Sequence, residues 1–303
     1  MPISLQHLEA NPVLYIGPSI ASLFIEAIET GILINQSFTF WERVDRERGI
    51  VRLLVAWVTC MAFLQTGFSF FSVWRTFVLN YGNWILAEDF SWGDRVQSTM
   101  TVSMASPVQA FLIWRCWTLI RKNWFMLISL SLVLVTSTIS SILVTIETFG
   151  TDFIVITDPS VTPPKIPITD GVLNDTCLVL DVSVTGILLT FLSRSKQHVL
   201  SSRVRRILKR LTILIWEAAL PPCICAITTT VMYLAVVNDN YWDLTFQAIL
   251  GKLYVISLFV TLNGRAGLQN HLPGVSTNPV SNLMWASSGP IRVDVRNVFL
   301  AIL

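Results

Sequence analysis

Seven continuous apolar stretches constrain what this chain can fold into more than any other feature of its sequence. They cover Val13–Phe40, Ile50–Trp74, Val96–Leu119, Trp124–Thr148, Val172–Ser193, Leu208–Val237 and Leu244–Leu262. Each has about 20 residues or more, the length of α-helix that crosses a hydrocarbon core of about 30 Å. Charged residues make up only 13% of the chain, whereas soluble domains carry about 25%. We therefore predict an all-α integral membrane protein, a bundle of seven transmembrane helices.

Lysines and arginines concentrate in every second connection between the apolar stretches. The basic connections are 41–49, 120–123, 194–207 and the C-terminal tail. The other connections, nearly free of base and richer in acid, are 1–12, 75–95, 149–171 and 238–243. Because basic loops are retained on the cytoplasmic side during insertion, this alternation predicts that the N-terminus lies outside and the C-terminus in the cytosol. The membrane would be the plasma membrane or an endomembrane.

This topology divides the chain into three parts. Residues 1–12 form a short outer N-terminus, residues 13–265 the helical domain, and residues 266–303 a cytosolic tail that we expect to be disordered. The strongest basic cluster, at 194–210, is expected to attract anionic lipid or to dock a cytosolic partner. Asn174 begins an Asn-Asp-Thr glycosylation sequon on the predicted outer side. The bilayer is the main expected partner, and no nucleic acid is expected.

Ionisable residues occur inside the predicted helices, where each costs roughly 2.5–3.5 kcal/mol near the bilayer centre. Those within a few turns of the midplane are Glu26, Glu29, Asp181, Glu217 and Lys252. Each should face the bundle and find a partner, and the i, i+3 spacing of the first two places them on one helix face. Since acids outnumber the single base, we expect some of the carboxyls to be protonated. Two interpretations remain open: a ligand or ion site, and a structural ion pair with hydrogen-bonded neutral acids.

No motif of a known enzyme is found in the sequence. It contains no zinc-ligand spacing, no phosphate-binding glycine loop and no nucleophile elbow. We therefore expect no enzyme activity, metal or cofactor. Lys252 lies midway along the last predicted helix, where microbial rhodopsins attach retinal. The third predicted helix, Val96–Leu119, lacks the carboxylate that would serve as counterion there, so retinal is not expected.

Several short patterns are shared with a known group of proteins. They are Gly31–Gln36 with Asp45, Gln109–Trp117, Asp181, Gly251–Tyr254 and Thr261–Arg265. With these the chain resembles a large group of uncharacterised seven-helix membrane proteins of basidiomycete fungi, catalogued as a domain of unknown function. The resemblance implies a topology similar to that of G-protein-coupled receptors, but no ligand, activity or partner.

Three polar residues are expected at the cytosolic ends of their helices, namely Arg115, Asn263 and Arg265. Cations there interact favourably with the negative ends of the helix dipoles. This stabilisation requires no signalling role.

The function expected from these features is that of a receptor-like sensor of a small molecule or lipid. One alternative is a transporter or proton-linked carrier that uses the charges within the helices. A membrane-embedded enzyme or a purely structural membrane protein is another. A continuous polar path between the two faces would favour transport, whereas a site open to the outside and closed below would favour a receptor.

Overall fold

The computed structural model describes residues 17–81, 92–119, 124–150, 218, 220–232 and 242–270. Its long helices are α3 (Gly17–Trp41), α4 (Gly49–Trp74), α6 (Trp92–Leu119), α7 (Trp124–Gly150) and α10 (Trp242–Asn270). A short 3₁₀ helix, η1 (Val44–Arg46), lies between α3 and α4, and a π-helical turn, η2 (Arg75–Leu79), continues α4. Leu220–Met232 is also helical. These described residues contain no strand, which confirms the all-α class for this part of the chain.

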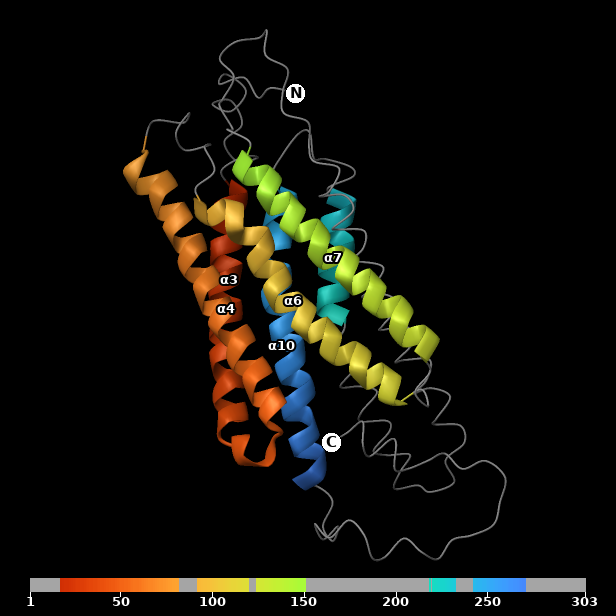
Figure 1. The fold of residues 1–303 in the computed structure, drawn as a ribbon. Coiled ribbons are helices and arrows are strands. Elements are labelled where there is room, and N and C mark those ends of the chain that lie inside the picture. The colour runs from red at the N-terminus through yellow and green to blue at the C-terminus, as the bar shows by residue number, and fades with distance from the viewer. Residues whose placement is uncertain are drawn as a thin grey trace, which may run out of the picture.

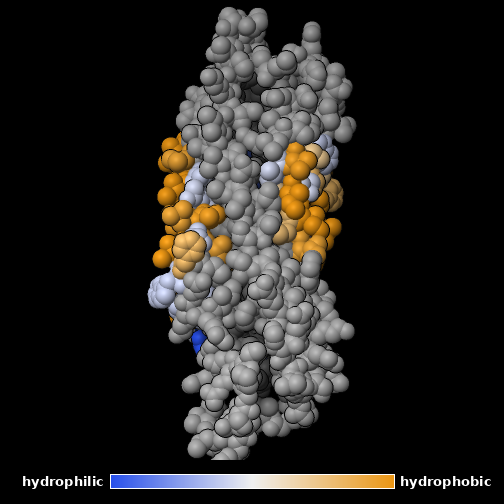
Figure 2. Space-filling model, turned by 90° about the vertical axis from the view of Figure 1, so that its right-hand side faces the viewer, coloured by the Kyte–Doolittle hydropathy of each residue, from blue (hydrophilic) through white to orange (hydrophobic). Residues whose placement is uncertain are grey.

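Three of the described helices are long and apolar enough to cross a membrane, judged by length and composition. They are Gly17–Trp41, Gly49–Leu79 and Thr245–Gly264. Large apolar side chains lie on the outside of α3, α4 and α7, among them Phe24, Ile28, Phe38, Ile50, Leu53, Phe125, Leu132 and Ile146. Figure 2 shows hydrophobic areas on two sides of the coloured surface. Because soluble monomers rarely expose apolar surface of this extent, these faces indicate a membrane protein.

The predicted number of seven spans stays a prediction. Val172–Ser193 and most of Leu208–Val237 lie outside the described residues. The outer N-terminus 1–12 and residues 271–303 of the tail do so as well.

Helix α10 is the central helix of the described bundle. In its most apolar stretch 72% of the residues are buried, against 22% in α3 and in α4. It packs most extensively against α3 and α6, and α6 in turn packs against α4 and α7 (Figure 1). Thr245 bonds to Pro18 near the start of α10, and Asn263 bonds to Gln36 near its end. Because the N-terminal parts of α3 and α10 bond to each other, and so do their C-terminal parts, the two helices run in the same direction.

Two helix ends differ from the boundaries predicted by the apolar stretches. Helix α10 continues to Asn270, beyond Leu262, so residues 266–270 of the predicted tail are helical rather than disordered. The side chain of Asn263 is held by α3, and no proline interrupts the helix before Pro273. Helix α6 begins at Trp92 instead of Val96, with Asp94 in its first turn. An acidic side chain there stabilises the positive end of the helix dipole.

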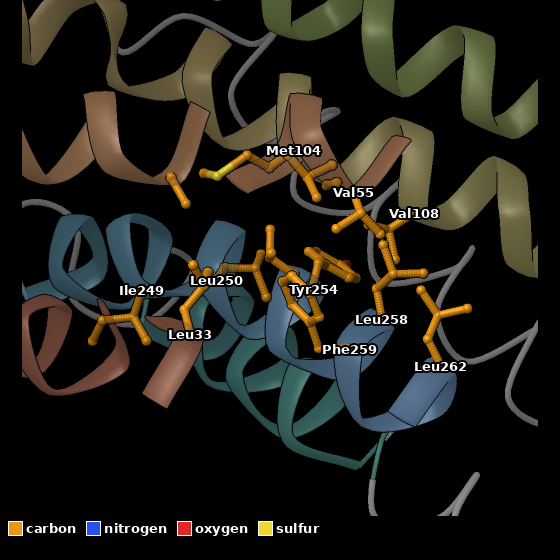
Figure 3. Close-up of a cluster of buried hydrophobic side chains, with 14 of the residues drawn as sticks. Leu33, Val55, Met104, Val108, Ile249, Leu250, Tyr254, Leu258, Phe259 and Leu262 are labelled. Atoms are coloured by element: carbon orange, nitrogen blue, oxygen red, sulfur yellow. The ribbon is translucent and has the colours of Figure 1, made fainter. Parts of the chain in front are cut away.

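Apolar side chains from α3, α4, α6 and α10 form one core. Its members include Leu33, Val55, Met104, Val108, Leu250, Tyr254, Leu258, Phe259 and Leu262 (Figure 3). Gly251 is where α10 comes closest to α6. A Cβ atom at this position would lie 2.6 Å from Met104 Cε and 3.2 Å from Thr101 Cα. The absence of a side chain at Gly251 is therefore required for this approach.

Replacing Gly251 with alanine should destabilise the bundle by about 1–3 kcal/mol, the usual cost of overpacking. Met104 is fully buried and the Thr101 contact is with backbone, so neither can move away freely. Thermal unfolding of the purified protein measures the effect. Gly67→Ala in α4 is the matched control, because a Cβ there meets nothing within 4 Å. Equal melting temperatures for the two variants would contradict the close approach.

Candidate functional site

An ion pair between α10 and α3 is buried completely inside the described bundle. Lys252 Nζ lies 2.7 Å from Glu26 Oε2, and both side chains are 0% exposed. The ammonium group also donates to the backbone carbonyl of Glu26 at 3.4 Å. Among the carboxyls of the described residues, the structure therefore pairs Lys252 with Glu26. A buried charge at this depth is tolerated only with such a partner.

The carboxylate of Glu26 is held from a second helix as well. Ser69 Oγ of α4 lies 3.0 Å from both Glu26 Oε1 and Glu26 Oε2, to either of which it can donate. Hydrogen bonds to an ionised group are stronger than those between neutral groups. Glu26 thus joins α3 to α4 and to α10 through one side chain.

Further polar side chains surround this pair. Thr30 and Thr66 share a hydrogen bond of 2.9 Å between α3 and α4. Gln65 Nε2 of α4 donates to the backbone carbonyl of Ala248 in α10 at 3.0 Å. The polar junction is our name for this set of side chains, which comprises Glu26, Glu29, Thr30, Gln65, Thr66, Ser69 and Lys252.

Glu29 is the member of the polar junction whose hydrogen bonding is incomplete. It lies one helical turn beyond Glu26 on the same face of α3 and is 5% exposed. Its Oε2 atom accepts no hydrogen bond from the described residues, and the same holds for Gln65 Oε1. Buried polar atoms usually have a partner, so these two oxygens distinguish the junction from a fully satisfied structural network.

An apolar layer separates the polar junction from the C-terminal ends of α3 and α10. It consists of Leu33, Phe40, Val55, Val58, Val255, Leu258, Phe259 and Leu262, each at most 3% exposed. Gln109 and Tyr254, also buried, bond to each other at 3.1 Å. Beyond the layer, Asn263 Nδ2 donates to Gln36 Oε1 at 2.8 Å and to its carbonyl at 3.0 Å. Ser257 and Thr261 of α10 are buried at the same level, so the described core between the junction and Asn263 is mostly but not wholly apolar.

The structure brings together three of the five residues predicted from the charges in the helices, namely Glu26, Glu29 and Lys252. Asp181 and Glu217 lie outside the described residues, as do Asn174 and the basic segment 194–210.

The residues expected at cytosolic helix ends lie in the C-terminal parts of α6 and α10, before the last turn of each helix. Arg115 is close to the end of α6, and Asn263 and Arg265 are in the C-terminal part of α10. Asn263 bonds to Gln36 of α3, a contact that the sequence did not predict.

Sequence reasoning missed Ser69 and Gln65. Both are polar residues in an apolar stretch, and their i, i+4 spacing places them on one face of α4. That spacing was the signal that could have revealed them. Among the described residues no group of three His, Cys, Asp or Glu side chains is placed to hold a metal ion.

These features define a class: a helical membrane protein whose central helix carries a buried, ion-paired lysine. Residues 177–267 match the model of a family described as a family of unknown function (DUF6534). The matched segment is less than a third of the chain and includes Lys252 and Asn263 of α10. No curated protein and no solved structure matches the chain. Similarity to a family of unknown function is thus found over this segment, whereas a fungal origin and seven helices stay predictions.

Replacing Lys252 with leucine should destabilise the protein by about 3–5 kcal/mol, because it leaves the Glu26 carboxylate buried without its counter-charge. Adding Glu26→Gln should restore most of the loss, since the double variant buries no unpaired charge at this position. Thermal unfolding in detergent measures both effects. Arg43→Leu, which removes an exposed charge, is the control and should change little. A Lys252→Leu variant as stable as the wild type would contradict the pair.

Proposed function

We propose that this chain is a receptor-like membrane protein that senses a small molecule or lipid at the polar junction. The observation that carries the proposal is the mostly apolar packing, among the described residues, between the junction and the C-terminal ends of α3 and α10. A carrier needs a polar path that continues through the bundle, and Phe259, Leu258 and Val255 stand across that path among the described residues. A site closed on one side suits a sensor.

The position of the junction along the helices supports access from the outer face. At 1.5 Å per residue, Glu26 lies about 14 Å from the first residue of α3 and about 22 Å from the last. In the proposed orientation, with the N-terminus outside, the junction lies in the outer half of the membrane. A ligand that reaches it from that side competes with or reinforces the Lys252–Glu26 pair. Because this pair joins α3 to α10, its state biases how the two helices pack.

The proposed orientation can be tested with epitope tags at the two ends of the chain. We expect an antibody to reach an N-terminal tag on intact cells, or on the lumenal side for an endomembrane location. A C-terminal tag should be reached from the cytosol alone. Selective permeabilisation of the plasma membrane separates these compartments. The reverse labelling would overturn both the orientation and the outer-side access.

Sensing predicts that a ligand stabilises the folded protein. A panel of sterols, fatty acids and small amines should contain a compound that raises the melting temperature of the purified chain. At 100 times Kd the gain is about 2.7 kcal/mol, or roughly 5 °C or more. The shift should be lost in the Lys252→Leu/Glu26→Gln double variant and retained in Arg43→Leu. The same shift in the double variant would place the site elsewhere.

A proton-linked carrier is the second candidate, and the incomplete hydrogen bonding of Glu29 favours it. The two functions differ in proton flux. The protein is reconstituted into vesicles that contain the pH dye pyranine and given a pH step. A sensor leaves the flux at the level of empty vesicles, whereas a carrier raises it and loses the increase in Glu29→Gln. Flux that depends on Glu29 would replace the sensor proposal.

A further inference from the structure

The polar junction contains two acidic side chains and one basic side chain. Lys252 is bonded to Glu26, whose carboxylate also accepts from Ser69. Glu26 therefore has its counter-charge and its hydrogen bonds. Glu29 has no second base to pair with among the described residues, although it is only 5% exposed. The junction is one positive charge short when both acids are ionised.

The charged groups near Glu29 come from two of the three described helices packed around it. Helix α3 contributes Glu26, and α10 contributes Lys252. The neighbouring part of α4 contributes only neutral groups, the hydroxyls of Thr66 and Ser69 and the amide of Gln65. Arg52 is at the opposite end of α4, where it donates to the carbonyl of Glu47. Nothing in these helices other than Lys252 can neutralise Glu29.

An ionised carboxylate that is buried and lacks a hydrogen-bond donor is strongly destabilising. A single added positive charge removes that cost. We propose that Glu29 binds one exchangeable positive charge, taken up as a proton or as a small alkali cation, beside the Lys252–Glu26 pair. The proposal does not depend on the sensing function, since the charge is needed whether the chain senses or transports.

Binding at Glu29 has a consequence for the ion pair. Glu26 and Glu29 are one turn apart on α3, and the charge of Lys252 interacts with both carboxyls. When Glu29 is neutralised, Lys252 has one ionised partner and stays with Glu26. When Glu29 loses its bound proton or cation, the carboxylates of Glu26 and Glu29 compete for the ammonium group of Lys252. Occupancy of Glu29 thus stabilises the observed contact between α3 and α10.

The test is the melting temperature of the full purified chain as a function of pH and of Na⁺, with choline keeping the ionic strength constant. In choline, the folded state holds a proton at Glu29 that the unfolded chain releases near neutral pH. The melting temperature should therefore fall with rising pH, by about 2–4 °C per pH unit. Glu29→Gln, which is neutral and nearly isosteric, should remove most of this slope and match or exceed the wild type above pH 8.

Measurements at high pH distinguish a proton at Glu29 from an alkali cation. If an alkali cation occupies Glu29, Na⁺ raises the melting temperature of the wild type at pH 8–9 but not that of Glu29→Gln. If only a proton does, Na⁺ has no effect and the pH slope alone is lost in the variant. Glu42→Gln, the same substitution at an exposed position, should behave like the wild type. A Glu29→Gln variant with the wild-type dependence on both pH and Na⁺ would overturn the proposal.

A second measurement uses the unaltered protein. Dicyclohexylcarbodiimide is lipophilic and reacts with protonated carboxyls, so mass spectrometry should find it on Glu29 and not on ion-paired Glu26. Labelling should decrease as the pH rises, and Na⁺ should decrease it further if the occupant is an alkali cation. Labelling of Glu26 in place of Glu29, or none at Glu29 at any pH, would contradict the assignment. This readout does not require any variant to fold.

Discussion

The burial of one ammonium group is the constraint on which the described bundle depends. Lys252 is fully buried in the central helix, and a charge in such a place is strongly destabilising without a partner. Glu26 supplies that partner at 2.7 Å, which fixes the position of α3 along α10. Ser69 then fixes α4 against the same carboxylate. The Glu26 carboxylate therefore holds three helices in register through the hydrogen bonds that it accepts from Lys252 and Ser69.

Tightly packed side chains around α10 surround the Lys252–Glu26 pair. Because α10 is buried on most of its circumference, its apolar side chains supply much of the core below the pair, including Val255, Leu258 and Phe259. Gly251, next to the lysine, allows α6 to approach closely. Lys252 therefore points toward α3 and α4 from a helix that is tightly packed against α6. Among the described residues, mostly apolar side chains pack between the junction and the C-terminal ends of α3 and α10, and this packing is the basis for proposing a sensor.

The sequence predicted the helices better than it predicted their contacts. Long apolar runs identify α3, α4, α6, α7 and α10 because a membrane span has a minimum length, and the ends agree to within a few residues except where tertiary contacts act. Helix α10 is longer than its apolar run, and Asn263 just beyond that run bonds to Gln36, a residue far away in the sequence. Such a contact leaves no local pattern.

The same reason limits how far the site could be predicted. The cost of burying Lys252 requires an acidic partner, but hydropathy does not give the register between helices, so the sequence offered Glu26, Glu29, Asp181 and Glu217 as equals. Ser69 shares one face of α4 with Gln65, but this spacing does not by itself show that Ser69 bonds to Glu26. Only the packing of α3 on α10 distinguishes Glu26, which is bonded, from Glu29, which is not.

The most direct test of this account measures the distance between the two charged groups in the membrane. Solid-state NMR on protein with ¹⁵N-labelled lysine side chains and ¹³Cδ-labelled glutamate reports Nζ to Cδ dipolar contacts. The account predicts a short contact that disappears in Glu26→Gln and persists in Glu29→Gln. A contact that survives in Glu26→Gln, or that disappears in Glu29→Gln, would show that Lys252 has a different partner and would contradict the account.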